Sequence, residues 1–192
     1  MKIAPLPVNE QERLKALSEY HILDTLPESE FDDITRIAST ICNTPISLIT
    51  IIDADRQWFK SNHGLNLIKN ETSRDVSFCA HAINIPSDVF MIPDSSKDDR
   101  FFDNPLVTGA PHVAFYAGVP LVNPEGFALG TLCVLDTATK QLDAEQVKTL
   151  QALARQIVCQ LELKRKVHQL RIKQEELEKA YEDLESFSTI AS

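Results

Sequence analysis

The chain has 192 residues, a formal net charge of −9 and a pI of about 5.0. This acidic balance argues against nucleic acid and anionic membrane surfaces as partners, because both require a basic binding surface. No stretch reaches the roughly 18 apolar residues of a membrane span, and the four cysteines are scattered without a CxxC pair, which is typical of reduced thiols in a cytoplasmic protein.

The first quarter of the chain predicts two helices and then a buried strand. Polar and apolar residues follow helical spacing from Glu10 to Tyr20. A second helix begins at Ser29 or Glu30 and ends at Asn43, because Pro45 disfavours helix in the residue before it. The apolar stripe expected on this helix consists of Phe31, Ile34, Ile37, Ala38 and Ile41. The β-branched run Ile46–Ile52 predicts a central strand covered on both faces.

The middle of the chain predicts short strands, a short helix and one long loop. The expected strands are Gln57–Ser61, Val89–Ile92, Phe115–Val122 and Phe127–Leu135, and the expected helix is Ser77–Ile83. The segment Asp94–Pro111 is rich in Asp, Asn, Ser, Gly and Pro, which indicates a loop. A loop of this length in a compact domain is often functional.

After Asp143, an expected N-cap, no glycine or proline interrupts the chain, which predicts one helix of about 45 residues. Its first part would pack on the domain through Val147, Leu150, Leu153, Ala154 and Ile157. Leucines then recur every seven residues, which is the pattern of a coiled coil. The seam expected to form a parallel homodimer consists of Leu163, Val167, Leu170, Gln174, Leu177, Tyr181 and Leu184. The charges oppose this orientation, because the first half of the seam is basic and the second half acidic, but exposed charge pairs contribute little.

Six aromatic-rich segments between Arg56 and Asp136 resemble the GAF sensory domain in their order and spacing. They are Arg56–Ser61, Ser77–Ile83, Ile92–Asp94, Asp98–Leu106, Phe115–Leu121 and Gly130–Asp136. The resemblance covers roughly residues 10 to 160. It implies an α+β fold with a mainly antiparallel central sheet, helices packed on one face and a long C-terminal coiled-coil helix. The domains expected are an N-terminal helix (1–20), a GAF domain (21–160) and a signalling coiled-coil helix (161–192).

The end of the chain, Leu184–Ser192, resembles the segment that precedes the phosphoacceptor helix of sensor histidine kinases. The resemblances together imply a cytoplasmic sensory and dimerisation module that controls a downstream histidine kinase domain in cis and has no catalytic residues of its own. Three alternatives stay open. They are the sensor of a diguanylate cyclase, a ligand-free dimer spacer, and a GAF-type free methionine sulfoxide reductase.

A ligand of unknown identity is expected under the Asp94–Pro111 loop. The candidate ligand-binding residues are Phe78, Cys79, Asp94, Arg100, Phe101, Phe115 and Tyr116. Each has a structural alternative, since aspartates cap turns and aromatic rings also fill cores. Cys133 either packs in a strand or pairs with Cys79 as a redox thiol, and Arg100 either binds an anion or serves the turn. We expect no metal and no nucleotide cofactor, because neither a spaced ligand set nor a phosphate-binding glycine motif is present.

Overall fold

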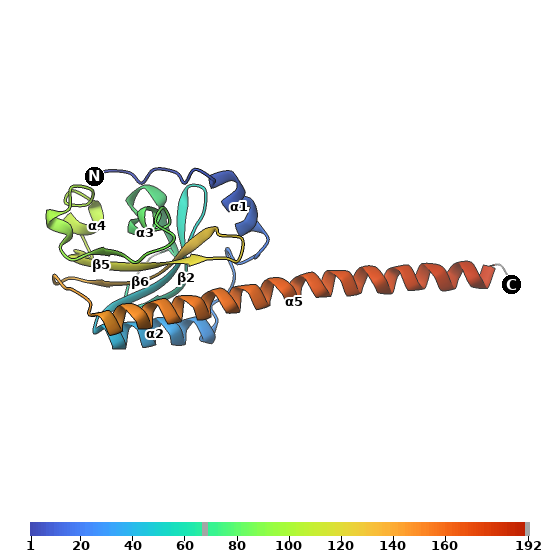
Figure 1. The fold of residues 1–192 in the computed structure, drawn as a ribbon. Helices are drawn as coiled ribbons and strands as arrows, with labels where there is room; N and C mark the ends of the chain where they lie inside the picture. Colours follow the sequence, from blue (N-terminus) through green and yellow to red (C-terminus); the bar gives the residue numbers. More distant parts are fainter. Residues whose placement is uncertain (67–68, 191–192) are drawn as a thin grey trace.

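The computed structural model describes residues 1–66 and 69–190, apart from the side chains of residues 187–190. A six-stranded sheet of order β3-β2-β1-β6-β5-β4 forms its centre (Figure 1). The strands are β1 (Ile46–Ile52), β2 (Arg56–His63), β3 (Glu71–Ser73), β4 (Phe90–Ile92), β5 (Phe115–Val122) and β6 (Ala128–Asp136). Every pairing among them is antiparallel. The α+β fold expected from the sequence is therefore confirmed, and β3 is the one described strand that the pattern did not predict.

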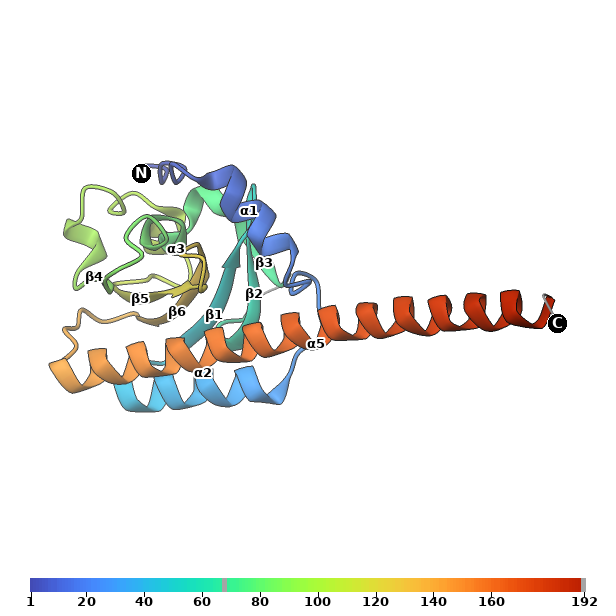
Figure 2. The same cartoon turned by 45° about the vertical axis from the view of Figure 1, so that its right-hand side comes forward.

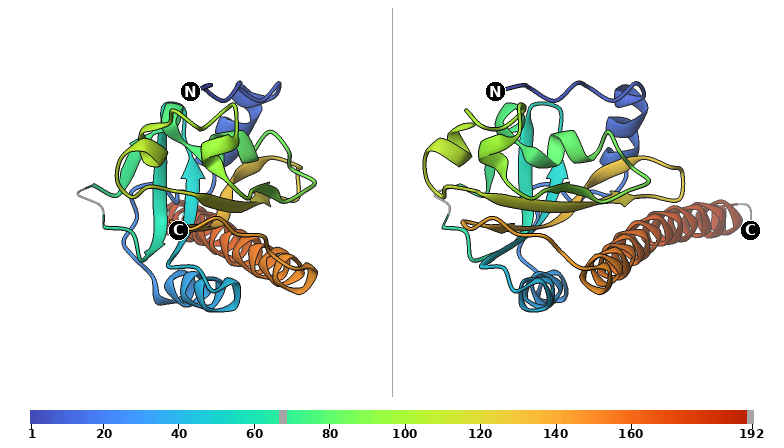
Figure 3. Two further views of the ribbon diagram at one scale, coloured as in Figure 1. Left: turned by 90° about the vertical axis from the view of Figure 1, so that its left-hand side faces the viewer. Right: turned by 60° about the vertical axis from the view of Figure 1, so that its left-hand side comes forward.

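The helices lie on both sides of this sheet. They are α1 (Glu10–Ser18), α2 (Ser29–Cys42), α3 (Phe78–Ala82), α4 (Pro105–Thr108) and α5 (Ala144–Ile190), with 3-10 turns η1 (Arg74–Val76) and η2 (Ser95–Lys97). The two long helices, α2 and α5, run side by side under one face, as expected (Figure 2). The short helices α3 and α4 lie over the other face (Figure 3). No helix in the described part of the chain is long and apolar enough to cross a membrane.

Each face of the sheet has its own apolar core, because successive residues of a strand point to opposite sides. In β1, Ile49 and Ile51 pack toward α2 and α5, whereas Leu48 and Ile52 pack toward α3. All seven residues of β1 are buried, as the β-branched run predicted. A central strand covered on both faces fixes where the two layers sit relative to each other.

The buried side of α2 differs from the predicted stripe. Phe31 and Ala38 are fully buried as expected, but Ile37 and Ile41 are 43% and 39% exposed. The contact with the sheet instead continues through Thr35 and Cys42. The sheet and α5 cover only one side of α2, so the outer edge of the apolar stripe stays in solvent.

The segment Asp94–Pro111 is built from short capped turns and not from an extended loop. The Asp94 carboxylate accepts a hydrogen bond from the Ser96 amide and begins η2. The Asn104 side chain accepts one from the Leu106 amide and begins α4, with Pro105 in its first turn. Proline is well suited to that position because its missing N–H would have no helical partner there. The polar residues that indicated a loop are therefore the caps of these turns.

The long helix α5 begins with a reciprocal cap, in which the Gln146 amide donates to Asp143 and the Asp143 amide donates to Gln146. Leu150 and Ile157 then pack fully buried against the domain. The helix still contacts the domain at His168, whose ring lies against that of His21 with centroids 4.5 Å apart, and it then projects into solvent (Figure 1). Ser192, on which part of the kinase resemblance rests, lies outside the described residues.

Candidate functional site

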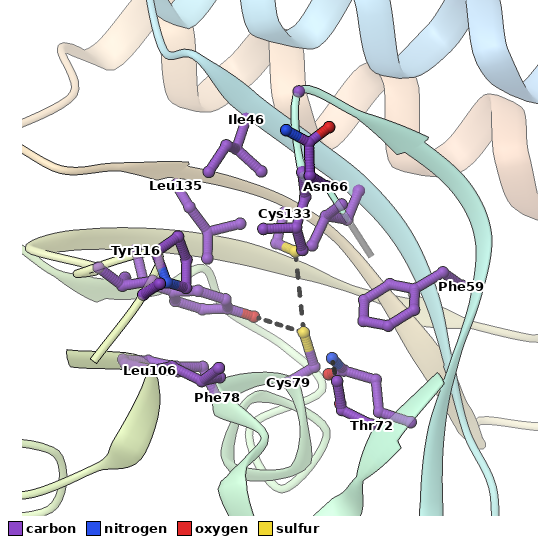
Figure 4. Close-up of a pocket in the computed structure, with 17 residues that line it drawn as sticks. Ile46, Phe59, Asn66, Thr72, Phe78, Cys79, Leu106, Tyr116, Cys133 and Leu135 are labelled. Carbon is purple, nitrogen blue, oxygen red and sulfur yellow. Dashed lines mark hydrogen bonds between the residues drawn. The ribbon is translucent and has the colours of Figure 1, made fainter. Parts of the chain in front are cut away.

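A cavity of about 360 Å³ lies on the face of the sheet that carries α3 (Figure 4). Its walls come from β1, β2, β3, α3, α4, β5, β6 and the segments before β3 and β5. The lining residues are Ile46, Leu48, Gln57, Phe59, Gly64, Leu65, Asn66, Thr72, Phe78, Cys79, Leu106, Ala110, Pro111, Val113, Tyr116, Cys133 and Leu135. None of these described residues is Asp, Glu, Lys, Arg or His. Such a mainly apolar cavity with a few polar groups has the character of a small-molecule site.

Strand alternation decides which aromatic residues reach the cavity. Tyr116 lines it, while its neighbour Phe115 points to the opposite face and packs in the core under α2 and α5. The Tyr116 ring lies along β5 over Gly118, where a Cβ atom would collide with its hydroxyl. Gly118 thus leaves the space in which the Tyr116 hydroxyl can turn toward the cavity.

The polar end of the cavity is a pair of cysteines. Cys79 comes from α3 and Cys133 from β6, and their sulfur atoms are 3.7 Å apart (Figure 4). The Tyr116 hydroxyl donates a hydrogen bond to the Cys79 sulfur at 3.2 Å. The two threonines Thr50 and Thr131 lie next to them and bond to each other across β1 and β6. Residues from β1, β5 and β6 therefore converge on the thiol of Cys79, which α3 carries.

These contacts shift the pKa values of the two cysteines in opposite directions. Burial disfavours the Cys79 thiolate, but hydrogen bonds from Cys133, Thr131, Thr50 and Tyr116 outweigh it and lower the pKa of Cys79 below its usual range. Burial raises the pKa of Cys133 well above its usual range, and the neighbouring Cys79 raises it further. Burial and the Cys79 charge also raise the pKa of Tyr116, which keeps its hydroxyl a donor. The arrangement favours one thiolate beside one thiol.

The structure brings three of the seven predicted ligand-binding residues to the cavity, namely Phe78, Cys79 and Tyr116. Phe101 stacks behind Phe78 with ring centroids 4.1 Å apart, so it supports the wall without lining it. Phe115 lies on the other face, and Asp94 caps η2. Neither Asp94 nor Arg100 is among the described residues that line the cavity.

The side chain of Arg100 is committed to local contacts. Its guanidinium pairs with Asp98 and lies over the rings of Phe90 and Phe101 at 4.9 Å and 5.4 Å. These contacts agree with the turn role that was one of the two alternatives for Arg100. Among the described residues, no group of three or more His, Cys, Asp or Glu side chains could hold a metal ion.

Sequence reasoning missed the wall formed by Gln57, Phe59 and Thr72, together with Leu65 and Asn66 from the turn after β2. The register of β2 could have supplied part of it, because Gln57 and Phe59 alternate with Trp58, which packs in the opposite core. Thr72 reaches the cavity because β3 pairs with β2. The three residues of β3 are too few to show a hydrophobic pattern, so the sequence did not indicate this strand.

A second candidate site is the free part of α5. Leu163, Leu170, Leu177 and Leu184 are 60%, 66%, 67% and 67% exposed, as are Val167 and Tyr181 at 56% and 65%. The apolar side chains of the seam are thus largely exposed, and the seam residue Gln174 donates a hydrogen bond to Glu178 one turn further along the helix at 2.9 Å. At its base, Lys164 pairs with Glu28, and Arg165 pairs with Glu19, Glu125 and Glu162. Two of the basic residues that opposed parallel pairing are therefore neutralised by the same protomer.

Comparisons with known proteins agree with this architecture. The chain is 38% identical over 162 residues to a cyclic di-GMP phosphodiesterase of Pseudomonas aeruginosa. The aligned region covers 84% of this chain but 27% of that protein. The chain therefore spans about a quarter of the length of this relative.

Solved structures also share the fold. The GAF domain of an Acinetobacter phosphoenolpyruvate-protein phosphotransferase is 15% identical with a TM-score of 0.59, over 83% of this chain and 96% of that one. A domain described as part of a two-component sensor histidine kinase of Sinorhizobium meliloti is 14% identical with a TM-score of 0.59, over 75% and 97%. A free methionine-R-sulfoxide reductase of Thermoplasma acidophilum is 12% identical with a TM-score of 0.57, over 76% and 94%. At these identities the likeness shows the fold alone.

The model of a protein family described as GAF domain matches residues 27–161 of this sequence. This match covers most of the sheet, the cavity and the packed half of α5. The chain therefore belongs to the GAF domain family.

Proposed function

We propose that this chain is a cytoplasmic sensory and dimerisation module that controls an output enzyme joined to the end of α5. The observation that carries the proposal is the position of α5. Its first half packs under the sheet whose other face holds the cavity, and its second half projects with an unpartnered heptad seam. A change in the cavity can therefore reach the helix through β5 and β6, which contact both.

The heptad seam supports a parallel dimer. An exposed leucine gains roughly 1.5–3 kcal/mol when it is fully buried, so four leucines per chain provide a strong drive toward a partner. Because α5 is anchored to the domain at its N-terminal half, a parallel pair places both domains at one end and both output enzymes at the other. Gln174 at a seam position can pair with its twin and fix the register.

The first candidate for the output enzyme is a histidine kinase. The support is the sequence Leu184–Ser192, which resembles the segment that precedes a phosphoacceptor helix. A second candidate is an enzyme of cyclic di-GMP metabolism, and its support is the 38% identity to the phosphodiesterase of Pseudomonas aeruginosa. Both candidates give α5 the same role, which is to transmit the state of the cavity along a paired helix.

The reductase alternative has less support from the cavity. Free methionine sulfoxide is a zwitterion, and a buried charge requires a partner. None of the described residues that line the cavity is Asp, Glu, Lys, Arg or His, so the carboxylate of methionine sulfoxide would have no cationic side chain as a partner there. This lining suits an uncharged and largely apolar ligand.

The test uses the protein encoded by the complete gene, assayed for autophosphorylation with ATP and for turnover of cyclic di-GMP. Leu170→Glu should change the output activity at least about tenfold, because a charge buried in the seam separates the helices. Ile172→Glu is the matched control, since it makes the same change at a residue 43% exposed and off the seam. It should leave the activity within about twofold.

The two assays distinguish the two output enzymes. Autophosphorylation that depends on Leu170 supports the kinase, and cyclic di-GMP turnover with the same dependence supports the second candidate. Equal activities in Leu170→Glu and the unaltered protein, or the absence of both activities, would contradict the proposal.

A further inference from the structure

The Cys79–Cys133 pair has a geometry that simple packing does not require. The sulfurs lie 3.7 Å apart although the residues are 54 positions apart in sequence. A disulfide needs a sulfur–sulfur distance of about 2.05 Å, so the two atoms, already in contact at 3.7 Å, have to approach each other further to bond. We propose that this pair is a modification site, in which a small uncharged hydroperoxide oxidises the two thiols to a disulfide.

The contacts assign different roles to the two sulfurs. The Tyr116 hydroxyl donates to Cys79 and its neighbours Thr50 and Thr131 add further hydroxyl groups. A sulfur that accepts several hydrogen bonds carries negative charge more easily, and the thiolate is the nucleophile in thiol chemistry. Cys79 is therefore the attacking sulfur. Cys133 keeps its proton and lies in place to resolve the product.

The cavity determines which oxidants reach the pair. Cys79 and Cys133 are 2% and 0% exposed, and both line the cavity (Figure 4). The lining is mainly apolar, so an anionic reagent would lose its hydration on entry and would meet the Cys79 thiolate as a like charge. Hydrogen peroxide or a short alkyl hydroperoxide is uncharged and small enough for a volume of about 360 Å³. The pair thus selects oxidants by charge and size.

The reaction balances with the hydroperoxide as the only co-reactant. The Cys79 thiolate attacks the terminal oxygen, an S–O bond forms, the O–O bond breaks, and the leaving oxygen takes a proton as water or alcohol. The product is Cys79 sulfenic acid. The Cys133 sulfur then attacks the Cys79 sulfur, an S–S bond forms, and the hydroxyl leaves with the Cys133 proton as water. The peroxide gains the two electrons that the thiols lose.

The remaining cysteines provide internal controls. Cys42 is 0% exposed and packs in the core under α2 and α5, on the other face of the sheet. Burial raises the pKa of Cys42 to about 11, so this thiol is a poor nucleophile. Cys159 is exposed on α5 and is open to any oxidant in solution. The four thiols therefore differ in access and in reactivity.

A disulfide would join α3 to β6 across the floor of the cavity. Because β6 also pairs with β1 and contacts α5, oxidation would fix the wall of the cavity to the layer that supports the long helix. The chemistry of the pair is independent of the proposed function, and only the use of the disulfide as a signal depends on it.

The experiment treats the purified, reduced chain with hydrogen peroxide and alkylates samples over time after denaturation. Peptide mass spectrometry should show a disulfide between Cys79 and Cys133 that dithiothreitol reverses. Cys79 should become resistant to alkylation at least about tenfold faster than Cys42. Tetrathionate, a dianionic oxidant, should modify Cys159 and leave the pair reduced.

Two variants separate the roles. Cys133→Ser should stop at a Cys79 sulfenic acid that dimedone traps, and Cys79→Ser should leave Cys133 open to alkylation. The time course of the unaltered chain tests the proposal by itself. A folding defect in Cys133→Ser or Cys79→Ser would therefore leave that test intact. A pair that stays reduced while Cys159 is oxidised would overturn the proposal, as would oxidation of Cys133 at an unchanged rate in Cys79→Ser. Such a failure would leave the role of α5 untouched, because that role is tested by the Leu170→Glu activity.

Discussion

A buried arginine near the N-terminus shows how single residues hold the layers of this domain together. Arg13 is 1% exposed, pairs with Glu10, and donates to the carbonyl oxygen of Ile52 at 2.8 Å. Arg74 also pairs with Glu10. The half-buried Glu10 carboxylate is well compensated by its two guanidinium partners, whereas leaving a buried charge such as that of Arg13 without its partner usually destabilises by about 3–5 kcal/mol. Glu10 therefore links α1 to η1 and, through Arg13, to the end of β1.

This cluster makes stability depend on pH in a defined direction. Burial raises the pKa of Glu10, but hydrogen bonds from Arg13 and Arg74 outweigh it and lower the pKa of this carboxyl below its usual range. A lowered folded-state pKa gives stability that is present above the unfolded-state pKa and lost as pH falls through the folded-state pKa. We expect the free energy of unfolding, measured in urea, to fall more steeply in the unaltered chain than in Glu10→Gln as the pH is lowered below the ordinary pKa of a glutamate.

Glu12→Gln at an exposed position of the same helix is the control and should keep the steep fall. Parallel curves for Glu10→Gln and the unaltered chain would show that Glu10 contributes nothing to the pH dependence.

At the scale of residues, the sequence predicted the cavity only in part. Phe78, Cys79 and Tyr116 were recognised because they lie in dense motifs, and the possible pairing of Cys133 with Cys79 was among the open alternatives. Asp94, Phe101 and Phe115 were placed with them because they lie in or beside the Asp94–Pro111 loop, under which a ligand was expected. Strand alternation turns Phe115 to the other face, the Asp94 carboxylate caps η2, and Phe101 packs behind Phe78. The type of a single residue indicates little about where its side chain points.

At the scale of elements, β5 shows how strand composition controls the cavity. Gly118 faces the Tyr116 ring, and the nearest atom to a Cβ built on Gly118 would be the Tyr116 hydroxyl oxygen. Gly118→Ala should therefore displace the ring and destabilise the domain by about 1–3 kcal/mol, as overpacking of a core usually does. Thermal or urea unfolding measures this cost.

In a Tyr116→Phe background the same substitution should cost less, because the nearest colliding atom is gone. Equal costs in both backgrounds would show that the Tyr116 hydroxyl does not occupy the space that Gly118 leaves.

The elements themselves were largely readable from the sequence. β1 and α5 carry long runs with clear periodicity, so their type and extent followed from pattern alone. The strand β3 has three residues and depends on pairing with β2, and α4 has four residues and depends on the Asn104 cap. Short elements of this kind are determined by tertiary contacts and capping, which a hydrophobic pattern does not record.

At the scale of the whole molecule, the sheet separates the two candidate sites. One face holds the cavity with its cysteine pair. The other face packs on α5 (Figure 2), whose heptad seam is exposed. The basic residues at the start of the free helix pair with carboxylates of their own domain, which reduces the repulsion expected between parallel helices. The central claim is that α5 pairs in parallel with its twin and carries the state of the domain away from it.

The most direct test of this claim is cysteine cross-linking along α5 in a background with Cys159→Ser. A chain with Leu177→Cys should form a disulfide-linked dimer under mild oxidation, because each seam residue meets its own twin in a parallel pair. Ile172→Cys, off the seam, should cross-link far less. The contradicting result is an uncross-linked Leu177→Cys chain together with efficient linkage between Leu163→Cys and Leu184→Cys chains in a mixture, since only antiparallel helices bring those two positions together.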